Sequence, residues 1–252
     1  MRLAKRDMLS HVQMQLALEN NCQPGAFFRG ENIITTPVCP EARRKFHTAP
    51  FFLKMVTMGG NAVLSADERL HPFLREFVKD KDGHWLFEHP HLRAIDAVLA
   101  PFGKQLFQTH HMFLPCEEAA PAACTYPVAW FEREELRPFY EKQPWPNALA
   151  PTFDNMMRPD ILAAAAKDGD EIIALAGASA DTELMWQIGI DVRPAYRGRG
   201  IGAYLVSLLR TEIEKRGKLP YYGTSLSNLA SQRIALHCGF RPAWVETETI
   251  EW

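Results

Sequence analysis

The sequence lacks the charge imbalance that would tie it to nucleic acid. Its 252 residues contain 28 Lys and Arg against 30 Asp and Glu, which gives a formal net charge of -2. A chain this close to neutral has no general attraction for a polyanion. No block of basic residues forms a binding arm either. We therefore expect no nucleic-acid partner.

Long apolar runs are also missing. A stretch such as 161–166 is far too short to cross a bilayer. The first twenty residues are interrupted by Arg2, Lys5, Arg6 and Asp7, so we expect no signal peptide there. The cysteines are odd in number and form no CxxC pair, which is typical of free thiols in a reducing compartment. They are Cys22, Cys39, Cys116, Cys124 and Cys238. We expect a cytoplasmic protein with no membrane partner.

The composition is that of a folded globular protein, with 47% hydrophobic and 23% charged residues. Its composition changes near residue 120. Residues 1–114 hold eight of the nine histidines, and residues 114–127 form an Ala- and Pro-rich stretch that we interpret as a connector. We predict a smaller α/β domain over 1–120 and a second domain over 121–252. Histidines 84, 89, 91, 110 and 111 have neither HxxxH spacing nor a cysteine cluster beside them, so we predict no metal site.

Two helices are expected in the N-terminal half. Residues 66–78 place Leu70, Phe73, Leu74 and Phe77 on one face at helical spacing. Residues 92–102 repeat the pattern and stop at Gly103. Residues 106–114 are predicted to form a strand.

The C-terminal half alternates between strand and helix patterns. Asp168 and Gly169 predict a hairpin between 161–166 and 171–179, although one Ala-rich helix is the alternative because alanine favours helix. The apolar stripe of 200–216 predicts a helix that stops at Gly217. Other strands are expected at 126–131, 184–192, 220–225 and 243–249, and other helices at 133–142 and 228–237. The pattern indicates an α/β (α+β) fold with a mixed sheet flanked by helices.

The run from Ile190 to Gly202 (IDVRPAYRGRGIG) carries the clearest chemical signal. A strand is followed by a Gly-rich turn that opens a helix, where free backbone N–H groups attract an anion. The glycines allow close approach, and Arg197 and Arg199 add positive charge. A phosphate or pyrophosphate suits this construction. The Rossmann fingerprint and the P-loop both fit poorly, because the acidic residue of the first and the GK[ST] of the second are missing.

Two motifs in the right order resemble the GNAT acetyltransferase superfamily. Arg197-x-x-Gly200-x-Gly202 is similar to its R/Q-x-x-G-x-G/A signature. Asn228 and Ser231, followed by Gly239-Phe240, are similar to its second signature. The resemblance covers residues 126–252 and is closest to a bacterial branch with long, divergent N-terminal regions. It implies a GNAT-like, mostly antiparallel mixed sheet, preceded here by the smaller N-terminal domain.

The resemblance also implies a cofactor site and a reaction. Acetyl-CoA would be the cosubstrate, its pyrophosphate on the backbone of the turn and its pantetheine between strands 184–192 and 220–225. The acyl group would pass to an amine by direct attack. The implied cofactor-binding residues are Ile190, Val192, Arg197, Gly198, Arg199, Gly200, Ile201, Gly202, Asn228 and Ser231.

The sequence departs from the family where protons are handled. The usual base and acid positions hold Trp186 and Ala235. We therefore predict Asp191 as base, with Glu183 or His237 as alternatives through water, and Tyr222 as acid. A non-catalytic acyl-CoA sensor, or degenerate transferase domain, is the alternative function.

The acceptor is expected to be a small-molecule amine rather than a protein. The mild acidity of the chain favours a cationic acceptor, and the N-terminal half is expected to form one wall of its groove. An oligomer is compatible with the sequence.

Overall fold

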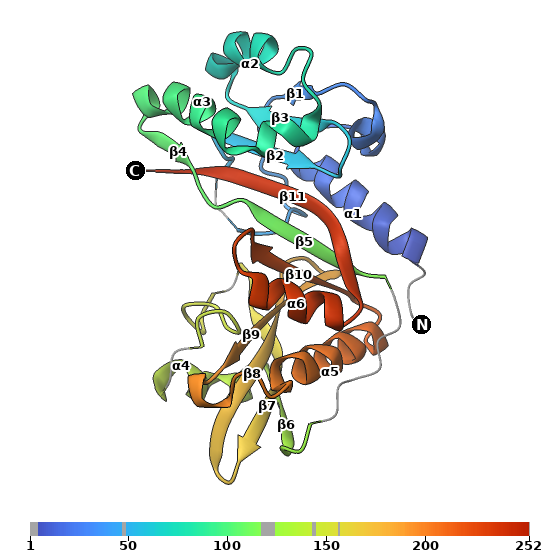
Figure 1. Ribbon diagram of the computed structural model, residues 1–252, viewed down its shortest axis with the longest axis vertical. Coiled ribbons are helices and arrows are strands. Elements are labelled where there is room, and N and C mark those ends of the chain that lie inside the picture. Colours follow the sequence, from blue (N-terminus) through green and yellow to red (C-terminus); the bar gives the residue numbers. More distant parts are fainter. Residues whose placement is uncertain (1–4, 47–48, 117–123, 143–144, 156, 252) are drawn as a thin grey trace. The chain divides into compact units, whose positions relative to one another are not determined.

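The computed structural model describes residues 5–46, 49–116, 124–142, 145–155 and 157–251 (Figure 1). The chain divides into two compact units. Unit 1 comprises residues 1–8, 113–224 and 228–241, and unit 2 comprises 9–112, 225–227 and 242–252. The two units therefore interleave along the sequence. The predicted division at residue 120 stays a prediction, and residues 117–123 of the predicted connector lie outside the described residues.

Unit 1 is built on a mixed sheet in the order β10-β9-β8-β7-β6. Neighbouring strands run antiparallel except β9 and β10, which are parallel. This confirms the predicted mixed, mostly antiparallel sheet flanked by helices. The strands are β6 (Val128–Glu132), β7 (Asp160–Asp168), β8 (Glu171–Ala180), β9 (Met185–Val192) and β10 (Leu219–Ser225), and the helices are α4 (Arg137–Lys142), α5 (Ile201–Lys215) and α6 (Leu229–His237).

The Ala-rich segment is a hairpin and not a helix. Strands β7 and β8 pair antiparallel around Gly169, whose φ of 60° lies in the left-handed region that favours glycine. Alanines 163 to 166 are all fully buried, because the sheet is covered on both faces. Small side chains let both layers approach closely.

Helix α5 covers one of those faces and packs on β7, β8 and β9 (Figure 1). Ile201, Leu205, Leu209 and Ile213 are buried along it, which confirms the predicted stripe. The helix is followed by Gly217 at φ 71°, the predicted left-handed stop. The opposite face of the sheet is covered by α4 and by residues 145–153.

The strands of unit 2 lie in the order β1-β3-β2-β11, with β4 paired to β11. Its core gathers apolar side chains from β2, β3, α2 and α3. The elements are α1 (Lys5–Glu19, mostly in this unit), β1 (Ile33–Thr35), β2 (Leu53–Thr57), β3 (Ala62–Ala66), α2 (His71–Phe77), α3 (His89–Leu99) and β4 (Lys104–Leu106). Strands β5 (His110–Pro115) and β11 (Phe240–Glu251) each run from one unit into the other.

The predicted helices of this unit are present with shifted ends. The first begins later than expected, because Ala66 still belongs to β3 and Asp67 caps a 3₁₀ turn before α2. The second begins at His89 and ends at Leu99, with a further 3₁₀ turn before Gly103. The predicted strand over 106–114 is two strands, β4 and β5, because residues 107–109 leave the sheet.

A buried cluster of charges ties unit 2 together. Arg44 pairs with Glu19 at 2.8 Å and with Glu246 at 2.7 Å. Lys54 lies 3.2 Å from Glu19 and 3.5 Å from Glu246. All four side chains are at most 6% exposed. Buried charges are tolerated when they are paired and hydrogen-bonded in this way.

Candidate functional site

Strands β9 and β10 pair along only part of their length. Their parallel register runs from Met185–Leu219 to Ile188–Tyr222. Strand β9 then continues to Val192, and β10 also continues beyond Tyr222. The register therefore ends inside both strands, which opens the backbone of β9 beyond Ile188 to a partner other than β10. This is the position where the sequence predicted a gap for pantetheine.

The turn after β9 presents bare backbone at the start of α5. Gly198 and Gly200 have φ values of 78° and 77°, and Gly200 is the N-cap of the helix. No side chain caps this helix end, and a Cβ placed on either glycine would meet no atom within 4 Å. The first N–H groups of a helix have no partner within the helix, so this end is suited to an anion. The predicted anion site is thus sterically open.

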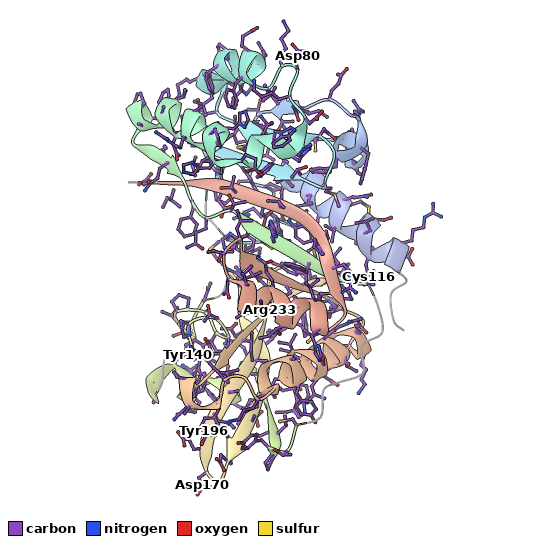
Figure 2. The ribbon with its side chains drawn as sticks, in the orientation of Figure 1. Asp80, Cys116, Tyr140, Asp170, Tyr196 and Arg233 are labelled. Carbon is purple, nitrogen blue, oxygen red and sulfur yellow. The ribbon has the colours of Figure 1, made fainter. Side chains whose placement is uncertain are left out.

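The two arginines of the turn hold its shape. The Nε atom of Arg197 donates to the carbonyl of Val192 at 3.1 Å. Arg199 donates to the hydroxyl of Tyr126 at 2.8 Å and lies over the ring of Tyr196. Tyr196 in turn donates to Asp168 of the neighbouring hairpin, and Figure 2 shows it near Asp170 of that hairpin. Both guanidinium groups are exposed, so their charge remains available to a ligand.

Gly202 and Ile201 have packing roles as well. A Cβ on Gly202 would lie 3.2 Å from a methyl group of Ile234 and 3.3 Å from one of Val192, closer than ordinary contacts. Ile201 is 1% exposed in the same core, where Ile190 also packs. These residues set the distance between α5, α6 and β9. Their contribution to a ligand site is through the backbone.

The second motif lies at the start of α6. The side chain of Asn228 accepts the backbone N–H of Ser231 at 3.1 Å, so Asn228 is the N-cap of this helix. The hydroxyl of Ser231 lies 2.7 Å from that of Tyr222. The structure therefore brings together Tyr222, Ser231 and Asn228 from the two predicted residue sets.

Tyr222 lies on the α5 side of the sheet, at the last paired position of β10. It is 1% exposed and packs with Ile188 and Phe240. Burial raises the pKa of its phenol to about 12, against the lowering effect of the hydrogen bond with Ser231. Tyr222 therefore keeps its proton throughout the neutral range.

Asp191 lies on the other face of β9. One carboxylate oxygen accepts the backbone N–H groups of Asn147 and Ala148 at 2.8 and 2.9 Å, and the other accepts the side-chain amide of Asn147 at 2.6 Å. Three of about four lone-pair positions are occupied in this way. Asp191 fixes the 147–148 segment on the sheet, and the structure does not bring it together with Tyr222. The alternative bases Glu183 and His237 are both exposed.

A polar network that the sequence did not predict lies on the same face as Asp191. The Nε atom of Arg158 donates to Asp181 at 2.7 Å and its Nη2 atom donates to Gln187 at 2.6 Å. Ser179 and Tyr221 also donate to Asp181. The pairing of Tyr221 with Gln187 follows from the β9–β10 register, which only the structure reveals. The sequence offered one clue to this network, which is that Tyr221 directly precedes the predicted Tyr222.

Trp186 and Ala235 stand at the positions where the family usually has its base and its acid, and both are buried.

Within the described residues, no group of three or more His, Cys, Asp or Glu side chains is placed to hold a metal ion. No helix in that part of the chain has the length and apolar character of a membrane span.

Residues 126–240 match the family described as the acetyltransferase (GNAT) family. The match begins just before β6 and ends at the start of β11, so it contains both motifs and the parted strands. No curated protein matches the sequence.

Solved structures of three bacterial proteins are similar to this chain. A GCN5-related N-acetyltransferase-like protein from Streptococcus suis 89/1591 is 16% identical, with 79% of this chain and 83% of that chain covered and a TM-score of 0.50. A GCN5-related N-acetyltransferase from Kribbella flavida is 13% identical, with 76% and 80% covered and a TM-score of 0.44. A GNAT-family acetyltransferase from Colwellia psychrerythraea is 16% identical, with 65% and 63% covered and a TM-score of 0.44, so the match spans less than two thirds of that protein.

Proposed function

Residues 126–240 belong to the GNAT acetyltransferase family, and on that premise we propose that the chain transfers an acyl group from acyl-CoA to the nitrogen of an amine. The observation that carries the proposal is the parting of β9 from β10 directly before an uncapped, glycine-opened helix end. The backbone groups of β9 beyond Ile188 no longer pair with β10. A short distance along the same stretch of chain, the first N–H groups of α5 have no partner within the helix. A long molecule with amides and a pyrophosphate would use both.

The proposed cofactor site follows this stretch from β9 to α5. The pantetheine amides would pair with backbone groups of Ile190 and Val192. The pyrophosphate would lie on the N–H groups of the turn, with the exposed charges of the two arginines nearby. The turn residues assigned to it are Arg197, Gly198, Arg199, Gly200, Ile201 and Gly202. The fit is supported by the open space over Gly198 and Gly200.

Asn228 and Ser231 are assigned to the same ligand from the side of α6. The Asn228 side-chain oxygen is used by the helix cap, which leaves its amide N–H groups as the donors for the pantetheine arm. The Ser231 hydroxyl has Tyr222 as its partner. Its proposed contact with the phosphates would therefore compete with, or extend, that hydrogen bond.

In the proposed reaction the neutral amine nitrogen attacks the thioester carbonyl carbon. A C–N bond forms, the C–S bond breaks, and the electron pair of that bond leaves with the sulfur. One proton must leave the nitrogen and one must reach the CoA thiolate. A thiol has a pKa of about 8.5, so the thiolate is already a good leaving group near neutral pH.

We assign the acid role to Tyr222 and the base role to Asp191. Tyr222 holds a proton across the neutral range and lies where the two strands part. Asp191 lies on the opposite face of β9, from which the acceptor would approach, and would reach the amine through a water molecule. Its three hydrogen bonds to the 147–148 segment give the carboxylate a fixed position.

The alternative function is an acyl-CoA-binding sensor without catalysis. The observation in its favour is that the usual base and acid positions hold buried Trp186 and Ala235, neither of which can move a proton. Such a protein would bind acetyl-CoA with no turnover.

The two functions are separated by a coupled assay. The protein is mixed with acetyl-CoA and a panel of primary amines, and both free CoA thiol and N-acetyl product are measured. A transferase releases one thiol for each amide formed, and only when an acceptor is present. Tight binding of acetyl-CoA without thiol release for any amine would support the sensor and overturn the transferase.

A further inference from the structure

A row of polar side chains crosses β8, β9 and β10 where the last two strands part. Gln187 of β9 is the cross-strand neighbour of Ser179 on β8 and of Tyr221 on β10. It directly precedes Ile188, the last residue of β9 that is paired with β10. Ile188 packs in the core beneath α5, and side chains alternate between the faces of a strand. Gln187 therefore lies at the closed end of the gap, on the face away from α5.

The amide group of Gln187 has a fixed orientation. The Nη2 atom of Arg158 donates to its oxygen at 2.6 Å, and the hydroxyl of Tyr221 donates to the same oxygen at 3.4 Å. A guanidinium cannot accept a hydrogen bond, so the amide must turn its oxygen to Arg158 and its NH₂ group away. In the part of the chain that the structure describes, that NH₂ group has no protein partner. Because Gln187 is only half-buried, the NH₂ group is a neutral donor that a ligand can use.

A buried carboxylate holds Arg158 in this position. Asp181 is 1% exposed, and it accepts from the Nε atom of Arg158 at 2.7 Å, from Ser179 at 2.8 Å and from Tyr221. Arg158 also donates to Ser179 and to Gln187. The guanidinium is thus used within the row, where it supports the Gln187 amide and offers no free charge to a ligand.

The charges beside the row disfavour an anionic ligand. Arg158 and Asp181 form an ion pair and neutralise each other. Asp191 lies on the same face of β9, and its three printed partners are neutral N–H groups of the 147–148 segment. Its negative charge is therefore not balanced by a cation. A carboxylate brought to this face would be repelled, whereas a neutral oxygen would meet the donor of Gln187.

The segment that covers the sheet directs a ligand to Gln187. A Cβ on Gly189 would lie 1.8 Å from the carbonyl oxygen of Asn147, so the 147–148 segment lies on β9 directly after Ile188. The pyrophosphate of the proposed cofactor is assigned to the start of α5, at the open end of the gap. Its thioester would therefore reach the closed end, and an amine that attacks it from this face would lie beside Gln187.

We propose that the Gln187 NH₂ group binds a neutral oxygen of the acceptor, and that the preferred substrates are amines with a hydroxyl or carbonyl oxygen close to the nitrogen. This inference rests on the proposed function and names its substrate class. The hydrogen bond from Gln187 holds the oxygen and turns the amine nitrogen towards the thioester. The unbalanced charge of Asp191 attracts the ammonium form of the acceptor and repels a carboxylate.

The test compares four acceptors that share the leucine side chain, with the full chain at saturating acetyl-CoA. Leucinol carries a hydroxyl, leucinamide a carbonyl, leucine a carboxylate, and isopentylamine no oxygen. Each kcat/KM is expressed per concentration of unprotonated amine, because the four amines differ in basicity. We expect leucinol and leucinamide to exceed isopentylamine by about 3–10-fold, the range of a neutral hydrogen bond, and leucine to be the poorest acceptor.

Two variants assign that preference to Gln187. Gln187→Leu removes both polar atoms at similar size, and Gln187→Glu keeps an oxygen for Arg158 but has no NH₂ group. In both, the ratio of kcat/KM for leucinol to that for isopentylamine should fall to about one. Calorimetry with CoA bound should show that leucinol binds about 3–10-fold more weakly to both variants. The control Gln23→Glu adds a charge at an exposed position of unit 2 and should keep the wild-type ratio.

Calorimetry with acetyl-CoA separates failure of this inference from failure of the proposed function. If the wild-type chain does not bind acetyl-CoA, the proposed function falls and the subsite falls with it. If binding is intact, the subsite alone is overturned by equal use of leucinol and isopentylamine, by leucine as the best acceptor, or by an unchanged ratio in the folded Gln187 variants. Equal losses for all acceptors with a lower melting temperature would mean that the row only holds the strands together.

Discussion

Tyr222 is a buried phenol whose acidity can be tested directly. Burial raises its pKa to about 12, so it stays protonated up to that pH and its own titration lies above the assay range. Tyr222→Phe should lower kcat by about tenfold, the weak end of general acid catalysis, while KM for acetyl-CoA changes little. The pH profile should keep both limbs between pH 6 and 10. Loss of a limb near pH 8 or 9 in this variant would contradict the raised pKa.

Asp191 has two roles that one substitution can separate. As the proposed base it should take up the proton that leaves the amine, so Asp191→Asn should lower kcat without weakening acetyl-CoA binding. The control is Asn147→Ala, which removes one of the three hydrogen bonds and leaves the carboxylate in place. This control should lower the melting temperature and retain the wild-type kcat. If Asp191→Asn behaves as Asn147→Ala does, Asp191 is a positioning residue only.

Residue types alone could not assign the polar network of Arg158, Asp181 and Gln187. Arg158 and Gln187 are separated by 29 residues in sequence, and a one-residue change of register would move Gln187 to the α5 face. The motif residues were easier to predict, because a glycine turn before a helix is a local feature. The structure places Gly198 and Gly200 in the left-handed conformation that the motif requires.

At the scale of elements, the packing of the 147–148 segment against the sheet depends on Gly177 and Gly189. A Cβ on Gly189 would lie 1.8 Å from the carbonyl oxygen of Asn147, which no side-chain movement can relieve. Gly189→Ala should therefore destabilise the fold by about 3 kcal/mol or more, at the upper end of overpacking effects. Gly25→Ala, whose Cβ would meet no atom within 4 Å, should change little. Chemical denaturation measures both, and equal midpoints would show that the segment does not pack on β9.

Element prediction succeeded where the pattern was long or the turn was specific. Helix α5 and its stop at Gly217 follow from one apolar stripe, and the hairpin at Gly169 follows from a turn that a helix would not tolerate. The β2–β3 hairpin was missed. Its strands are fully buried on both faces, so they show no alternation that would distinguish them. Helix α1 was missed because its apolar residues are scattered around its circumference.

At the scale of the whole molecule, the chain does not divide at one point. Residues 242–252 group with 9–112, although in sequence they follow residues 126–240, which match the acetyltransferase family. Strand pairing explains this, because Val245 to Glu248 of β11 pair with Lys54 to Thr57 of β2. Contacts between residues so far apart in sequence leave no local signal, so the grouping of 242–252 with 9–112 could not be predicted. The sequence showed only a change of composition near residue 120.

The charge cluster of unit 2 should make stability depend on pH in two directions. Burial alone would raise the pKa values of Glu19 and Glu246, but Arg44 and Lys54 outweigh it and hold both below their usual range. Their stabilisation is present above about pH 4.5 and is lost as pH falls further. Glu248 differs, because burial and then the charge of Glu246 raise its pKa from 4.5 to about 7. Its raised pKa weakens folding as pH rises from about 4.5 to 7.

Glu248→Gln should therefore stabilise the protein at pH 8 by about 1–3 kcal/mol and leave stability at pH 4.5 nearly unchanged. Urea denaturation at both pH values measures this. Glu31→Gln removes the same charge at an exposed position and should have little effect at either pH. A variant at 248 that is less stable at pH 8 would mean that its carboxylate is needed in the charged form.

The most direct measurement is the affinity for acetyl-CoA of two matched glycine variants. Gly200 and Gly217 flank the same helix, have φ values of 77° and 71°, and both face open space. Valine should strain the backbone similarly at both positions, but only at Gly200 would it stand where the pyrophosphate binds. By isothermal titration calorimetry, Gly217→Val should keep the wild-type Kd, while Gly200→Val should weaken binding about 100-fold or more. Equal affinity of the two folded variants would contradict acyl-CoA binding at the start of α5.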